Sequence, residues 1–406
     1  MTPELVRRQP LELAAGQVLA PGSPVDLAAV ARLPTPRAAL EAAILPALAS
    51  GPCLVSFSGG RDSSAILAVA TMLARQEGLD PPVPVTMRFP AHEPTDERSW
   101  QEQIVAHLQL PDWQQLACGD ELHILGPVAR ALVRRHGVVF PPNSYLHVPL
   151  IEPACGGVLL TGIGGDEIVG GIRWSRTAAV LEGRRFPRPR DLLGVGFALA
   201  PLPVRRSLSR RALRGIAPWL QPDARRRALR ALATHWGAEP ILWSDRLRWW
   251  LEAPYIQSAQ NTFAVLAADA DASVLHPLLD HRFVAALSRL PSEKRWTTRT
   301  AGMRALFADL LPDEVLRRSG KASFAHIFAP QPRLELVRQW GGEGIDQELV
   351  DPVELRRTWT AQHVDPGSIP LLQHVAHVLE DRDGQADVSS RASSTTAGST
   401  LISRGR

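Results

Sequence analysis

Lysine is almost absent from this chain, although basic residues are common. Lys294 and Lys321 are the only lysines among 45 basic residues, and the formal net charge is +4. So strong a preference for arginine over lysine is typical of biased codon usage, and most of the arginines therefore need no functional explanation. A retained lysine is of greater interest, because a planar guanidinium cannot always replace a compact ammonium group.

Cysteines and long apolar runs are also scarce. Cys53, Cys118 and Cys155 are scattered and show no metal-ligand spacing, which argues against structural zinc and favours a reducing cytoplasm. The sequence has no run of about eighteen apolar residues and no charged-then-apolar leader. We therefore expect a soluble cytoplasmic protein that does not span a membrane.

Residues 53–69 (CLVSFSGGRDSSAILAV) show a strand, a glycine turn and a helix in immediate succession. The short apolar run predicts a buried strand, and helical spacing starts directly after the two glycines. Glycine lets the backbone approach a ligand, and the first N–H groups of a helix attract an anion. Asp62 can hold a Mg²⁺ that bridges phosphate oxygens, and Ser58 and Ser63 can hydrogen-bond to them. An ordinary turn between strand and helix is the alternative.

Strands and helices alternate through the first half of the chain. This order predicts a parallel sheet with ligands at the carboxyl ends of its strands. Beyond residue 236 the pattern is mostly helical. The predicted strands are residues 53–57, 83–89, 113–118 and 156–162, and the predicted helices are residues 37–49, 95–108 (capped by Thr95) and 120–136.

Composition divides the chain into five expected parts. These are a lead-in (residues 1–36), an α/β core (37–172), an Arg/Pro-rich helical insertion (173–235), a helical part (236–384) and a disordered tail (385–406). From Arg173 to Arg230 there are fifteen arginines against three acidic residues. Such a segment is either a set of solvated helix faces or a docking site for an acidic peptide, carrier protein or RNA. RNA is disfavoured, because aromatic residues do not interleave with the basic ones.

A second glycine cluster, residues 161–171 (TGIGGDEIVGG), also follows a predicted strand. It should therefore lie on the same sheet edge as the first glycine turn. Asp166 and Glu167 stand among its glycines, and a triphosphate with Mg²⁺ needs carboxylates from more than one loop. The alternative is an acidic turn that caps a helix.

These two loops carry a family resemblance. The string SGGRDS (58–63) lacks the spacing of the P-loop NTPases and resembles the SGGxDS loop of the ATP pyrophosphatases. The second loop resembles the GxG(A/G/S)DE…GG element of the asparagine synthetase synthase domain and its amide-forming relatives, β-lactam synthetase and the lasso peptide cyclases. Residues 277–285, 310–316 and 317–324 resemble further segments of that family in the same order. The resemblance implies an α/β fold like the adenine nucleotide α-hydrolases.

The resemblance also implies roles for particular residues. Lys321 would stabilise the adenylation and acyl-transfer transition states, because a fixed cation offsets the negative charge that develops in each. Asp62 and Asp166 would bind Mg²⁺, and Asp166 and Glu167 would belong to the catalytic group. The nucleotide would be held by Ser58, Gly59, Gly60, Arg61, Asp62, Ser63, Met87, Phe89, Gly162 and Gly164, with adenine at the backbone of residues 87–89. Lys294 matches no motif and is expected to be solvated.

Two departures from the family narrow the expected function. Ile163 stands where relatives carry a proton-accepting Glu or Tyr, so the amine arrives neutral, or Glu167 or another nearby group accepts the proton. Thr2 stands where a glutaminase domain would begin with a cysteine, and too few residues precede Ser58 for that domain. Ammonia would therefore come free or from a partner, or the nucleophile is an organic amine.

We therefore expect an AMP-forming ligase that uses ATP and Mg²⁺ to join a carboxylate to an amine. A peptide macrolactam cyclase is the favoured subtype, with a precursor peptide, protease or carrier protein as partner at the Arg-rich segment and no membrane. The alternatives are an ammonia-dependent asparagine synthetase and a non-catalytic nucleotide-binding subunit. Transfer RNA thiolation is weakened by the absence of a motif cysteine that could carry sulfur.

Overall fold

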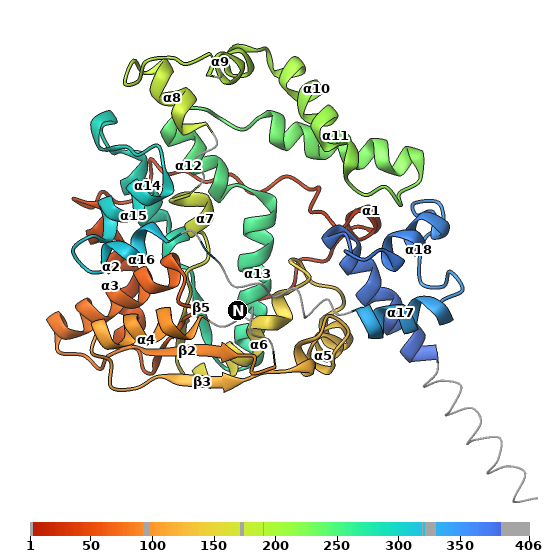
Figure 1. Cartoon of the computed structure of the whole chain (residues 1–406), viewed down its shortest axis with the longest axis horizontal. Coiled ribbons are helices and arrows are strands. Elements are labelled where there is room, and N and C mark those ends of the chain that lie inside the picture. Colours follow the sequence, from red (N-terminus) through yellow and green to blue (C-terminus); the bar gives the residue numbers. More distant parts are fainter. Residues whose placement is uncertain are drawn as a thin grey trace, which may run out of the picture.

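The computed structural model describes residues 3–91, 97–170, 174–189, 191–318, 320 and 330–382. Its centre is a parallel five-stranded sheet with the strand order β3-β2-β1-β4-β5 (Figure 1). The predicted α/β class with a mostly helical second half is confirmed. The strands are β1 (Cys53–Ser56), β2 (Val83–Arg88), β3 (Gln114–Ala117), β4 (Val158–Leu160) and β5 (Ser273–Leu275).

The helices of the first half surround this sheet or extend from it. They are α1 (Pro10–Ala15), α2 (Pro36–Ala49), α3 (Arg61–Glu77), α4 (Arg98–His107), α5 (Pro127–His136), α6 (Val148–Ile151), α7 (Gly165–Ile168), α8 (Ser175–Leu181) and α9 (Asp191–Leu199).

Apart from β5, the regular structure of the described residues in the second half is helical. Its helices are α10 (Leu202–Ala212), α11 (Pro222–Gly237), α12 (Trp243–Leu251), α13 (Pro254–Asp269), α14 (His281–Ser288), α15 (Arg299–Phe307), α16 (Asp313–Arg317), α17 (Pro330–Gln339), α18 (Pro352–Thr360) and a last helix over residues 369–382.

Both faces of the sheet are covered by apolar layers. Successive residues of β1 point to opposite faces, so Val55 packs with α2, α3 and α14, whereas Leu54 packs with α5, α6 and α13. The neighbouring strand β4 repeats this alternation with Leu160 and Leu159. A parallel sheet buried on both faces leaves the ends of its strands as the place for a ligand.

Two predicted helices begin later than the sequence pattern suggested. The helix expected over residues 95–108 begins at Arg98 with Glu97 as its N-cap, and Thr95 lies outside the described residues. The helix expected over residues 120–136 is divided into a 3₁₀ turn, Asp120–Leu122, and α5, which begins at Pro127. Proline lacks an N–H group and fits the first turn of a helix but not its interior, so Pro127 fixes the start of α5.

A separate apolar cluster joins the two ends of the described chain. Trp219, Trp340 and Trp359 are buried in it, together with side chains of α1, α11 and the helix over residues 369–382. The indole N–H of Trp219 donates to the carbonyl oxygen of Ala14 at 2.8 Å. Within the described ranges, no helix is long and apolar enough to cross a membrane.

Candidate active site

The two glycine loops lie in contact at one edge of the sheet. β1 and β4 are adjacent and parallel, so their carboxyl ends bring the first turn and the second loop together. A Cβ atom added to Gly162 would lie 2.6 Å from the amide nitrogen of Ser63, and one added to Gly165 would lie 2.2 Å from Cγ of Asp62. Because glycine has no Cβ atom, the second loop can lie this close to the backbone and the carboxylate of the first turn.

The first turn presents backbone and hydroxyl groups at the start of α3. Gly59 has φ +78°, a conformation that favours glycine, and Gly60 is the N-cap of α3. The Ser58 and Ser63 hydroxyl oxygens are 3.2 Å apart, and the amide of Gly60 donates to Ser58 Oγ at 3.3 Å. The turn thus has the form of an anion site at a helix N-terminus.

Asp62 and Asp166 converge on one cation. The guanidinium of Arg299, the first residue of α15, forms ion pairs with both carboxylates. The hydroxyl of Thr298 caps α15 by accepting from the amide of Ala301 at 3.2 Å, which fixes the helix end that carries Arg299. Two carboxylates that share one positive group can also share a divalent cation.

The donor set fits Mg²⁺ held jointly with phosphate oxygens. Among the described residues there is no group of three or more His, Cys, Asp or Glu side chains that could hold a metal ion. Mg²⁺ is commonly bound by one or two carboxylates together with substrate phosphates, so Asp62 and Asp166 match that mode.

Three arginines surround the first turn. The guanidinium of Arg318 donates to the carbonyl oxygen of Gly59 at 2.9 Å and forms an ion pair with Glu97. Burial lowers the pKa of Arg61, and the nearby charges of Arg299 and Arg318 act in the same direction. A concentration of positive charge beside a helix N-terminus suits a polyphosphate.

A cavity of about 580 Å³ opens from these loops. The phosphate-side residues Asp62, Asp166 and Arg299 line one part, and Met87 and Phe89 line another. It therefore brings the predicted nucleotide-binding residues to a single space. Of the predicted set, its walls contain Ser58, Gly60, Arg61, Asp62, Ser63, Met87, Phe89, Gly162, Gly164, Asp166 and Glu167, and Gly59 lies between two of them in the turn.

Lys321 and the end of the second loop, Gly171, lie outside the described residues. Gly320, the residue directly before Lys321, lines the cavity. Lys294 is exposed, as the sequence suggested. The role of Lys321 remains a prediction.

Glu167 and Ile163 line the same cavity. Ile163 lines the cavity and supplies no ionisable group. The hydroxyl of Tyr255, on α13, donates to Oε1 of Glu167 at 3.5 Å. Burial raises the pKa of Glu167, and the neighbouring Asp166 and Asp62 raise it further. Glu167 is therefore an acceptor whose proton affinity exceeds that of an ordinary carboxylate.

Two histidines lie close together at the cavity: His147 lines its wall, and His276 is nearby. The ring of Phe263 contacts both, with its centroid 4.6 Å from that of His147 and 5.4 Å from that of His276. Nδ1 of His276 is 2.6 Å from the hydroxyl oxygen of Thr161, at the end of β4. Burial lowers the pKa of both histidines to about 4, and in His276 the proximity of His147 adds to the effect.

These histidines predict a loss of stability in mild acid. Their pKa in the unfolded chain is about 6.5, so the stabilisation is complete above that pH and is lost as the pH falls towards 4. Between pH 7 and 5 we expect the free energy of unfolding to fall by about 1–2 kcal/mol per histidine. Denaturant unfolding at both pH values measures this fall, which His147→Gln should reduce. His281→Gln, at an exposed position, is the control, and an unchanged fall in His147→Gln contradicts the prediction.

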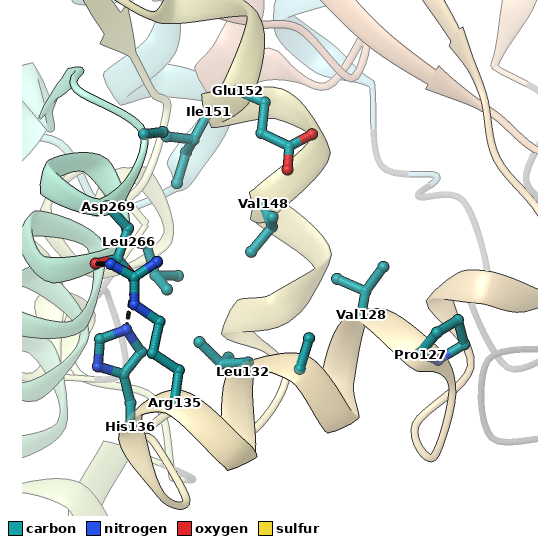
Figure 2. A pocket seen from close by; sticks show the side chains of 12 residues that line it. Pro127, Val128, Leu132, Arg135, His136, Val148, Ile151, Glu152, Leu266 and Asp269 are labelled. Carbon is teal, nitrogen blue, oxygen red and sulfur yellow. Dashed lines mark hydrogen bonds and ion pairs between the residues drawn. The ribbon is translucent and has the colours of Figure 1, made fainter.

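A second cavity, of about 420 Å³, lies between α5, α6 and α13 (Figure 2). Its walls are mainly apolar, with Leu132 and Leu266 among them. The carboxylate of Asp269 is paired there with His136 and Arg135. The charge of Asp269 is balanced by Arg135, and none of the described glycine-loop residues lines this space.

Sequence reasoning missed several side chains of the site, among them Arg299, Arg318 and Gln101. The side-chain amide of Gln101 donates to the carbonyl oxygen of Ser58 at 2.9 Å and so fixes the first turn from α4. An arginine carries little signal in a chain so rich in arginine. Only the position of Arg318, within residues 317–324, could have identified it.

The comparison with protein families agrees with this geometry. A family model described as asparagine synthase matches residues 36–375. The matched region contains all five strands, both glycine loops and α15. No curated protein matches the chain significantly.

Proposed function

Because the chain belongs to the asparagine synthase family, whose members are ATP-dependent carbon–nitrogen ligases, we propose that it joins a carboxylate to an amine and cleaves ATP to AMP and pyrophosphate. The observation that carries the proposal is the contact of the two glycine loops, which directs Asp62 and Asp166 to one cation beside a helix N-terminus. This arrangement suits the phosphates of one nucleotide.

The reaction would occur in two steps. An oxygen of the substrate carboxylate attacks the α-phosphorus of ATP, the bond to the β-phosphate breaks, and pyrophosphate leaves. The amine nitrogen then attacks the acyl carbon of the adenylate, AMP leaves with the bonding electron pair, and the nitrogen loses a proton. Adenylation is needed because a free carboxylate is a poor electrophile.

The described residues divide this work between two parts of the cavity. The first turn and the arginines around it, Arg61, Arg299 and Arg318, would bind and orient the polyphosphate. The wall containing Met87 and Phe89 would take the adenine. Mg²⁺ held by Asp62 and Asp166 would offset the negative charge of the phosphates. An enclosed site would also keep water from the adenylate.

We propose that Glu167 accepts the proton from the attacking amine. It lines the same cavity as Ile163, and the Tyr255 hydroxyl fixes the position of its carboxylate. In Glu167→Gln the acceptor is lost and the shape is kept, so we expect acyl transfer to slow by about 10²–10⁴-fold. Adenylation should continue.

A rapid-quench time course distinguishes these two steps. In Glu167→Gln we expect a burst of pyrophosphate of about one equivalent, followed by slow amide formation. His147→Gln changes another ionisable side chain of the cavity wall, one without a role in the proposed steps, and serves as the matched variant. If both variants slow amide formation equally, or if Glu167→Gln loses the burst, Glu167 is not the proton acceptor.

The substrate class we propose is a peptide carboxylate with an organic amine, as in a peptide macrolactam cyclase. The lack of an ionisable group at Ile163 supports this class over asparagine formation. The test is release of pyrophosphate and AMP with a panel of peptides, aspartate with ammonia, and other acids and amines. Amide products from peptides support the proposal, and turnover confined to aspartate with ammonia identifies an asparagine synthetase. Nucleotide binding without turnover across the panel identifies a non-catalytic subunit.

A further inference from the structure

Exposed large apolar side chains are concentrated in one short stretch of the chain. Among the described residues, twelve large hydrophobic side chains are exposed. Four are scattered, at Val6, Leu242, Leu275 and Val353, and the other eight lie between residues 181 and 208. We call this region the α8–α10 surface, and its exposed apolar residues are Leu181, Phe186, Leu192, Leu193, Leu199, Leu202, Val204 and Leu208.

Helix α9 presents an apolar face to solvent. Its sequence, DLLGVGFAL, would suit a buried helix, yet Leu192, Leu193 and Leu199 are 65%, 83% and 71% exposed. The opposite face of α9 is the one that packs on the protein. Phe197 stacks on Trp174 with ring centroids 4.9 Å apart, and a Cβ atom on Gly194 would lie 2.5 Å from the Thr177 hydroxyl oxygen. Because these contacts fix the inner face of α9 against the protein, the three leucines point toward solvent.

Helix α10 continues the surface with apolar and basic side chains. It packs along α11, and none of its residues is buried (Figure 1). Val204 and Leu208 are each 47% exposed, and Arg210 and Arg211 are exposed beside them. Exposed apolar side chains that gather in one region together with charged residues indicate an interaction site, whereas single exposed leucines need no explanation.

The charge of the surface is of one sign. Residues 181–215 contain nine arginines and two acidic residues. Both acidic side chains already have partners, because Asp191 pairs with Arg176, and Glu182 pairs with Arg184 and Arg295. A complementary partner must therefore supply negative charge.

The surface is joined to the catalytic loops. α8 begins at Ser175, soon after α7, which carries Asp166. Glu182 at the end of α8 forms an ion pair with Arg295 at 3.0 Å. The next residue, Trp296, donates from its indole N–H to the carbonyl oxygen of Val169 at 3.0 Å, and Arg299 follows in the same segment. The end of α8 is thus connected, through Arg295 and Trp296, to the loop that bears Asp166.

We propose that the α8–α10 surface docks an acidic, amphipathic segment of a peptide or protein. Apolar side chains of the segment cover the leucines of α9, and its carboxylates meet the arginines of α10. Two copies of this chain would not pair through the surface, because a symmetric contact would bring the arginines of both copies together. The link to the Asp166 loop favours a protein partner over a membrane.

This proposal rests on the proposed function in one respect: the docked segment is taken to belong to the substrate or to the partner that delivers the substrate. Docking itself is measured as binding, without turnover. The probe is a fluorescein-labelled 20-residue synthetic peptide with Glu and Leu in a helical repeat. The comparison peptide carries Gln in place of every Glu. We expect the acidic peptide to bind at least tenfold more tightly, and more weakly as salt concentration rises.

Two double variants and two matched controls locate the binding. Leu192→Ser with Leu193→Ser, and Arg210→Glu with Arg211→Glu, should each weaken binding of the acidic peptide at least tenfold. Arg227→Glu with Arg230→Glu makes the same charge change on exposed positions of α11, and Leu242→Ser removes an exposed leucine elsewhere. Neither control should weaken binding, and circular dichroism checks that all variants fold.

Three other results would overturn the docking proposal, and a fourth would overturn only the proposed function. Equal binding of both peptides, or unchanged binding in both double variants, overturns docking. Cosedimentation with phosphatidylglycerol vesicles that is lost in both double variants, without peptide binding, identifies a membrane instead. Concentration-dependent dimers that the variants abolish identify a second copy. If peptide binding holds but no carboxylate or amine is turned over, docking stands and the proposed function fails.

Discussion

Replacing Lys321 with alanine is expected to lower the rate of amide formation about 10²–10³-fold. Negative charge increases on the α-phosphate during adenylation and on the acyl oxygen during transfer, and a fixed ammonium group stabilises both transition states. Gly320, the preceding residue, lines the cavity. The measurement is pyrophosphate release and amide yield at saturating ATP, so that kcat is separated from KM.

Lys294→Ala is the matched control for Lys321. It removes the other lysine of the chain from an exposed position and should leave turnover unchanged. Lys321→Arg keeps the charge but changes its shape, and we expect it to restore only part of the rate. Equal activity of Lys321→Ala and Lys294→Ala would show that Lys321 has no role in either chemical step.

The sheet and its two loops could be predicted because their signals are local. Each loop combines a short apolar run, closely spaced glycines and an acidic residue within a few positions, and strands β1 and β4 follow from those runs. Strand β5 was missed, since it is only three residues long and two of these are exposed. Its place in the sheet is fixed by pairing with β4, which no local pattern reveals.

The cation between the two aspartates could not be predicted. Arg299 lies 133 positions after Asp166 in the sequence and reaches it only because α15 packs beside the second loop. The sequence predicted a metal between the carboxylates and offered no reason to choose one arginine among many. The Glu167–Tyr255 contact was missed for the same reason, as Tyr255 comes from α13.

Arg299 contacts both carboxylates, so removing the charge of either aspartate should disturb the whole group. Asp62→Asn keeps the shape of the side chain but removes its charge, so the pair with Arg299 and the capacity to bind Mg²⁺ are both weakened. A bound metal contributes several kcal/mol to charge stabilisation, so turnover should fall by about 100-fold or more. Asp166→Asn should act in the same direction.

Calorimetric titration with ATP, with and without Mg²⁺, separates a metal defect from a folding defect. In the wild-type protein Mg²⁺ should increase the affinity for ATP, and in Asp62→Asn this increase in affinity should be smaller. Asp313→Asn is the control, because this carboxylate also pairs with an arginine, Arg304, but at an exposed position away from the cavity. If Asp62→Asn retains the full gain from Mg²⁺, the two aspartates do not form one metal site, and Arg299 is their structural partner only.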